Sequence, residues 1–160
     1  MSALKGGPVE PCFAMHVRIP VVALRQWLNR LRSKPDVPLR GAPAVRRQKT
    51  YSSRSGYVYQ YFYLGQRPAL RGGEQGIEYV FEVTADRKIS FPVPVFLTSQ
   101  AVKSWNDSHG RILTRTEEYA IAKMALFQAF DERTHPGQMK HEIRVRPADV
   151  EGILETLDID

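Results

Sequence analysis

The feature that most constrains this chain's fold is a stretch of alternating tyrosines at residues 57–64. It reads Tyr-Val-Tyr-Gln-Tyr-Phe-Tyr-Leu. Because side chains alternate across a β-strand, the tyrosines share one face, and Val58, Phe62 and Leu64 share the other. Aromatic and β-branched residues favour strands, so we predict a β-strand here. We expect the rest of the chain to cover one or both of its faces.

Alternating apolar residues predict further strands on both sides of this one. They lie at residues 12–19, 45–52, 77–83, 89–97 and 142–146. The strands between residues 45 and 97 follow one another closely, as in an antiparallel meander. Pro92 and Pro94 lack the N–H group that a ladder needs, so we place their strand at an edge or a bulge.

Helical spacing of apolar residues predicts four helices. Residues 20–32 form the first, which completes an N-terminal β-α unit. A short helix begins near Thr98 and ends at Gly110. Thr114 and Glu117 have the spacing of a capping box, which begins the longest helix, residues 115–133. A C-terminal helix begins at Pro147.

Together these elements predict an α+β fold. We expect an antiparallel sheet of about five strands with the long helix packed on it. A length of 160 residues suits a single domain, residues 1–160. Within it, residues 34–44 form an arm rich in proline and arginine.

The positive charge of the chain lies in its first half. The net charge is +6, but residues 1–72 hold 13 Lys/Arg and only 2 Asp/Glu, whereas residues 73–160 hold 10 and 15. This asymmetry suggests an anionic partner, either nucleic acid or an acidic protein surface. The alternative is that the two halves neutralise each other within the fold or across a dimer.

Seven cations of the first half are the candidates for contacts with a polyanion. Most lie between residues 34 and 56, and two lie in a predicted glycine-rich loop, Gly65–Gly76, whose N–H groups can cradle an anion. That loop lacks the Gly-Lys-Ser/Thr sequence of a P-loop. The candidates are Arg40, Arg46, Arg47, Lys49, Arg54, Arg67 and Arg71.

The tyrosine face has two interpretations. If Tyr79 and Phe81 join Phe62 in the core, the tyrosines lie opposite on an open face, where they can stack on the bases of single-stranded nucleic acid. In the other interpretation, helices cover both faces and the tyrosines belong to the core with their hydroxyls hydrogen-bonded. The stacking candidates are Tyr57, Tyr59, Tyr61 and Tyr63.

No catalytic constellation stands out, so we lean toward a non-enzymatic binding module. An enzyme remains an alternative, with Lys123 or a histidine as acid or base beside the glycine-rich loop. A lysine in the apolar middle of a helix more often packs its stem on aromatics and reaches a carboxylate. Asp131, Glu132, His135 and His141 cluster in sequence but match no metal motif, and we expect no metal or cofactor.

The cysteine content, the N-terminus and the apolar helix surface indicate the cellular location and the assembly of the protein. One cysteine, Cys12, and an N-terminus without an apolar run favour the cytoplasm and exclude a disulfide framework. No apolar run is long enough to span a membrane. The long helix is apolar nearly all round and residues 149–160 carry five acids and no base, which suggests a homo-oligomer or a protein-interaction subunit as an alternative function.

Overall fold

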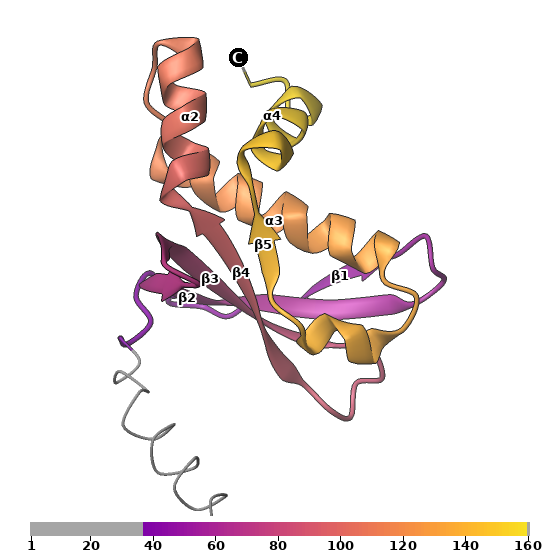
Figure 1. The fold of residues 1–160 in the computed structure, drawn as a ribbon. Coiled ribbons are helices and arrows are strands. Elements are labelled where there is room, and N and C mark those ends of the chain that lie inside the picture. The colour runs from indigo at the N-terminus through magenta and orange to yellow at the C-terminus, as the bar shows by residue number, and fades with distance from the viewer. Residues whose placement is uncertain (1–36, 160) are drawn as a thin grey trace, which may run out of the picture. The chain divides into compact units, whose positions relative to one another are not determined.

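The structure is a computed structural model that describes residues 37–159 (Figure 1). Four strands come first in this part of the chain, and helices and a fifth strand follow. They confirm the predicted α+β class. The predicted strand 12–19 and helix 20–32 lie outside the described residues. The strands are β1 (Lys49–Ser52), β2 (Val58–Arg71), β3 (Glu74–Thr84), β4 (Phe91–Thr98) and β5 (Ile143–Val145). The helices are α2 (Ser99–His109), α3 (Arg115–Glu132), the 3-10 helix η1 (Pro136–Lys140) and α4 (Pro147–Thr156).

The five strands form one sheet in chain order, β1-β2-β3-β4-β5. The first four pair antiparallel, as predicted, but β5 pairs parallel to β4, so the sheet is mixed. The wholly antiparallel sheet was therefore wrong. A parallel neighbour needs a long crossover connection. Helices α2 and α3 together with η1 supply that connection between β4 and β5.

The predicted loop at Gly65–Gly76 is wrong, because most of it belongs to two long strands. β2 runs through Gly65 to Arg71, and only Gly72 and Gly73, both with positive φ, lie between β2 and β3. The register shifts between Tyr63 and Gly65, which marks a β-bulge. Beyond the bulge, Arg67 pairs with Glu78. The strand therefore continues with its faces exchanged.

The prolines of β4 lie where this strand has one partner. Pro92 and Pro94 pair with Glu82 and Val80 of β3. On its other side β4 meets β5 only at Val95–Leu97. β4 is thus not an edge strand along its whole length, but its two prolines lie beyond the end of the β5 ladder and leave no ladder bond unmade.

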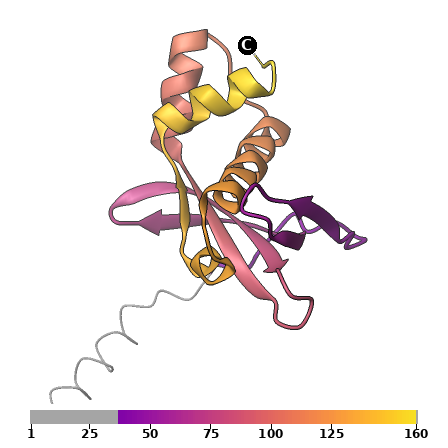
Figure 2. The ribbon, with the colours of Figure 1, turned by 90° about the vertical axis from the view of Figure 1, so that its right-hand side faces the viewer.

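Helix α3 lies across one face of the sheet (Figure 2), and the tyrosines of β2 pack against it. Tyr59 stacks on Phe130 with ring centroids 4.2 Å apart, and Tyr61 meets Phe127 edge-on at 5.5 Å. The register also puts Tyr63 beside Phe81 on this face. Of the two interpretations of the tyrosine face, the one that puts Tyr79 and Phe81 opposite the tyrosines does not fit this register, and Tyr59 and Tyr61 lie in the core.

The apolar surface of α3 is covered within the domain. Ile121, Ala122, Ala125, Leu126, Ala129 and Phe130 are buried. α2 and α4 pack side by side near the beginning of α3 (Figures 1 and 2). The helix therefore gives no reason of its own to expect a homo-oligomer, and the oligomeric state stays a prediction. Among the helices of residues 37–159, none has the length and apolar character needed to cross a bilayer.

The predicted capping box of α3 is present and allows a first test. The Thr114 hydroxyl accepts from the Glu117 N–H at 3.3 Å, and a Glu117 carboxylate oxygen accepts from the Thr114 N–H at 2.7 Å. Thr114→Ala is expected to lower the free energy of unfolding by about 1 kcal/mol in urea denaturation. Thr116→Ala, two residues on and exposed, is the control. An equal loss in both variants would contradict a capping role.

Candidate functional site

A hollow forms where the chain bows away from the free edge of β2. Arg40 and Gln66 exchange two backbone hydrogen bonds of 2.8 Å, and Lys49 is paired with Tyr61 where β1 begins. Between these two attachments the chain holds eight residues, 41–48, whereas β2 holds only four, 62–65. The longer segment cannot follow the edge and must leave a gap beside it.

Gly65 allows the first of these attachments. Its φ is +138°, and a Cβ atom here would lie 2.8 Å from the carbonyl oxygen of Arg40. Only glycine combines this backbone conformation with so close an approach of a second chain segment. The bulge in β2 and the Arg40–Gln66 bridge are thus built around the same residue, and together they position the segment that bounds the hollow.

The hollow is a pocket of about 420 Å³, which we name the β2-edge pocket. Its size falls in the range of about 300–1,000 Å³ that is usual for small-ligand sites. Aromatic rings from β2 and α3 form one wall, and the bowed segment forms the other. The lining residues are Gly41, Pro43, Val45, Arg47, Lys49, Tyr61, Phe62, Tyr63 and Tyr119.

Positive charge gathers at this pocket. Arg47 and Lys49 line it, and the Arg46 guanidinium lies 5.6 Å from the ring centroid of Phe62. None of the lining residues carries a carboxylate. Within residues 37–159, neither Arg47 nor Lys49 forms an ion pair. The pocket therefore carries uncompensated positive charge from the described part of the chain.

Lys123 of α3 adds a third cation beside Lys49. Its stem is half-buried and its ammonium lies 5.4 Å from the ring centroid of Phe127. Burial lowers the pKa of Lys123, and the charge of Lys49 lowers it further. An anion bound between the two lysines would relieve this repulsion and stabilise the charged form of Lys123.

The phenols of the pocket add no negative charge. Burial raises the pKa of Tyr61 and Tyr63 to about 12, with a smaller contribution from Tyr119. Burial also raises the pKa of Tyr119. The hydroxyls of Tyr61, Tyr63 and Tyr119 are therefore protonated at neutral pH and able to donate a hydrogen bond. The pocket thus combines flat apolar walls, neutral hydrogen-bonding groups and cations at its rim, which is a suitable environment for an aromatic group that carries a negative charge.

The predicted polyanion contacts separate into three groups in the structure. Arg46, Arg47 and Lys49 are exposed at or beside the β2-edge pocket. Arg40 is exposed at its bridge to Gln66. Arg54 lies at the β1–β2 turn, 3.8 Å from an Asp131 oxygen, with its side chain 88% exposed. Arg67 and Arg71 lie elsewhere, in a network of ion pairs with acidic side chains.

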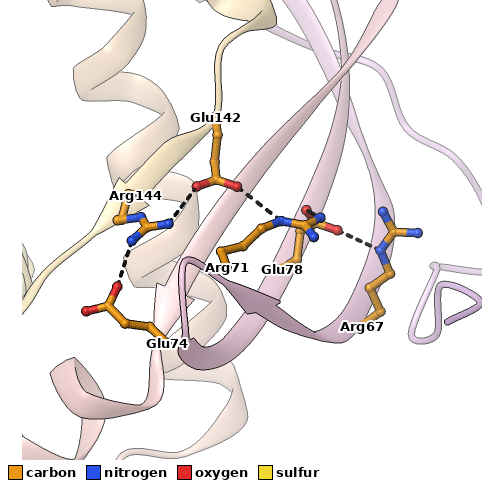
Figure 3. Close-up of polar contacts among 6 residues, drawn as sticks. All are labelled: Arg67, Arg71, Glu74, Glu78, Glu142 and Arg144. Carbon is orange, nitrogen blue, oxygen red and sulfur yellow. Dashed lines mark hydrogen bonds and ion pairs between the residues drawn. The ribbon is translucent and has the colours of Figure 1, made fainter. Parts of the chain in front are cut away.

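We name this network the carboxylate ladder (Figure 3). Glu78 alternates along β3 with Tyr79, whose ring packs near Tyr119 of α3, so the network lies on the sheet face opposite α3. Arg67 and Arg71 donate to the two oxygens of Glu78 at 2.6 and 2.7 Å. Arg71 also pairs with Glu142, which pairs with Arg144, which in turn pairs with Glu74. Arg67 and Arg71 are therefore paired with carboxylates within the protein. We assign them a structural role in the carboxylate ladder.

Glu78 is the buried centre of the carboxylate ladder, with its side chain 1% exposed. Burial alone would raise the pKa of this carboxyl. The hydrogen bonds and charges of Arg67 and Arg71 outweigh burial and hold its pKa below the ordinary value. Glu78 is therefore ionised at neutral pH. Its charge holds both guanidinium groups on its own face of the sheet, where the bulge in β2 has placed Arg67 and Arg71.

The predicted stacking tyrosines are mostly inaccessible. Tyr59 and Tyr61 are 0% and 4% exposed beneath α3, so their ring faces are not free for a base. Tyr57 is exposed just before β2, and Tyr63 is half-buried at the pocket. Tyr59 also departs from the expectation that buried hydroxyls are bonded, since its hydroxyl has no hydrogen-bond partner in the described residues.

Two ring residues of the pocket were not predicted as site residues. Phe62 was expected in the core because it alternates with the tyrosines, and Tyr119 was not singled out. Lys123 was singled out, but it contacts Phe127 instead of a carboxylate. Within residues 37–159, no three His, Cys, Asp or Glu side chains gather as a metal site would require.

Comparison with known proteins adds no function to this geometry. No family model, curated protein or solved structure matches this chain. The functional argument therefore rests on the residues around the β2-edge pocket.

Proposed function

We propose that this protein is a non-enzymatic binding module for nucleic acid and that the β2-edge pocket is its contact site. The observation that carries the proposal is that Arg47 and Lys49 line a pocket that no carboxylate lines, while the charge of Lys49 also acts on Lys123. Like charges held together without a counter-ion raise the free energy of the unbound protein. A phosphate backbone lowers it by supplying the missing negative charge.

The arrangement of the pocket supports nucleic acid over a simple anion. Arg40 and Arg46 extend the positive surface along the segment that leads into the pocket, which suits a chain of phosphates. Aromatic rings interleave with these cations, and such alternation is typical of nucleic-acid contacts. An acidic protein surface would pair with the cations but would make no stacking contact with the aromatic wall.

The proposal is tested by fluorescence anisotropy of a labelled oligonucleotide with the full chain over a range of salt concentrations. Lys49→Gln is expected to weaken binding several-fold at low salt and to reduce the slope of log K against log salt by about 0.7–1, the contribution of one phosphate contact. Lys103→Gln is the matched control, since Lys103 is an exposed lysine of α2 paired with Asp107.

The two variants separate a specific contact from general attraction to a basic protein. If Lys49→Gln and Lys103→Gln lose affinity equally, the pocket is not the contact site. If the unaltered protein shows no binding at low salt, nucleic-acid binding itself is wrong. Circular dichroism melting of both variants shows whether folding is retained.

A further inference from the structure

We propose, building on the proposed function, that the ligand is single-stranded and that one unstacked base enters the β2-edge pocket while its phosphate contacts the lysines at the rim. The pocket is concave and bounded on two sides, by the bowed segment and by the rings of β2 and α3. A duplex keeps its bases stacked inside and presents phosphates on its surface. A base must leave a stack to enter a pocket of this kind.

The walls of the pocket are shaped for a flat group. Tyr63 and Tyr119 are half-buried, so each ring is held in the protein while it lines the pocket. Tyr63 and Tyr119 meet edge-to-face with centroids 4.9 Å apart. Rings held in place by packing lose little conformational entropy when a base stacks on them.

Hydroxyl groups at the pocket are free to contact the edge of a base. Tyr61 and Tyr119 line the pocket, and neither hydroxyl bonds to another group of residues 37–159. A phenol accepts and donates, so it can pair with either an acceptor or a donor of a base. Stacking surfaces together with unbonded hydroxyls distinguish a base pocket from a site for phosphate alone.

The cations lie where the phosphate of the same nucleotide would be. Arg47 and Lys49 line the pocket beside the rings, and Lys123 lies within electrostatic reach of Lys49. One nucleotide can therefore contact both parts of the site, with its base on the aromatic wall and its phosphate at the charged rim. An inorganic polyphosphate or a sulfated sugar would satisfy only the rim.

The inference is tested by competition between three unlabelled ligands of about 12 nucleotides, within the usual site size for single strands. They are oligothymidylate, its abasic analogue and its duplex with oligoadenylate. Oligothymidylate is expected to compete roughly ten-fold better than the abasic strand, since stacking of one base contributes at least that factor in many proteins. The duplex is expected to compete like the abasic strand.

Tyr119→Leu locates the effect at the pocket, because Tyr119 lines it and its ring meets Tyr63. This variant is expected to bind oligothymidylate about as weakly as the abasic strand while keeping the same salt slope. The control is Phe91→Leu, because Phe91 is also a half-buried aromatic ring but does not line the pocket. Phe91→Leu should bind as the unaltered protein does.

The outcomes separate this inference from the function on which it rests. Equal competition by the intact and abasic strands, with a steep salt slope, overturns the base pocket but leaves polyanion binding in place. Equal competition by the duplex does the same. Failure of every ligand to bind at low salt overturns both. Fluorescence of an oligonucleotide containing 2-aminopurine reports stacking in the unaltered protein, so the test does not depend on a variant that folds.

Discussion

Arg67→Met is expected to lower the free energy of unfolding by about 2–4 kcal/mol. The substitution leaves the Glu78 carboxylate, 1% exposed, with Arg71 as its remaining partner in the carboxylate ladder. Breaking a buried ion pair costs about 3–5 kcal/mol, because a charge stays buried without its counter-charge. The second guanidinium group softens that cost here. Equilibrium unfolding in urea at neutral pH measures it.

Arg54→Met is the matched control for this loss. It removes the same side-chain charge from an arginine that is 88% exposed and 3.8 Å from Asp131. Pairs in such an exposed position contribute less than about 1 kcal/mol. If Arg67→Met and Arg54→Met lose the same stability, the carboxylate ladder does not stabilise the fold through burial of Glu78.

Lowering the pH should remove the stability that the carboxylate ladder contributes. The folded protein holds the pKa of Glu78 below its ordinary value of 4.5, so the unfolded chain takes up the proton first as pH falls. The stabilisation from ionised Glu78 is fully present above pH 4.5 and is lost as pH falls through the lowered folded pKa. Glu78→Gln lacks this titration. Its stability should therefore depend less steeply on pH than that of the unaltered protein below about pH 4.5.

Glu117 also takes up a proton in acid, so its effect on stability must be separated from that of Glu78. The hydrogen bonds of Arg111 and Thr114 lower its pKa to about 2, so it also contributes stability that acid removes. This contribution is common to the unaltered protein and to Glu78→Gln. The difference between their pH profiles therefore isolates Glu78, and identical profiles would show that Glu78 has the same pKa in the folded and unfolded states.

The elements that local sequence determines were predicted, and the contacts that depend on register were not. The capping box at Thr114 and the left-handed Gly110 fixed two helix ends, because capping involves residues only a few positions apart. The alternation from residue 57 predicted the first half of β2. It then failed at Leu64, because one bulged residue exchanges the faces of everything beyond it.

The candidate site was predicted only in part for the same reason. Arg46, Arg47 and Lys49 were identified by charge alone, which needs no knowledge of the fold. Tyr63 and Tyr119 are far apart in sequence and line one pocket because α3 packs against β2. Arg67 and Arg71 looked like free cations until the hairpin register placed Glu78 beside them. Sequence patterns describe single elements, and these contacts depend on pairs of elements.

Gly76→Ala is expected to lower the free energy of unfolding by about 3 kcal/mol, or to prevent folding, as overpacking and backbone strain do at closely packed positions. Gly76 is buried in β3. A Cβ atom at this position would lie 2.3 Å from the carbonyl oxygen of Leu97 and 2.8 Å from the Phe96 ring. The carbonyl belongs to the neighbouring strand β4, so it can move only if the ladder between the two strands opens.

The effect should reach the carboxylate ladder through Phe96. This ring is 0% exposed, and the Arg144 guanidinium lies 5.4 Å from its centroid. A methyl group that displaces Phe96 therefore also displaces the arginine that joins Glu142 to Glu74. Urea denaturation of Gly76→Ala and of the double variant Gly76→Ala/Arg144→Met measures this link, because residues that act on each other show non-additive losses.

Gly152→Ala provides a matched control with the opposite expected sign. Gly152 lies in α4, is exposed, and has no atom within 4 Å of the position a Cβ would take. Alanine there removes the flexibility of glycine from a helix, so the same substitution should raise the free energy of unfolding by about 0.5–1 kcal/mol. If both variants change stability alike, the close approach of β4 to Gly76 is not what excludes a side chain, and the packing of Phe96 against β3 is looser than the structure shows.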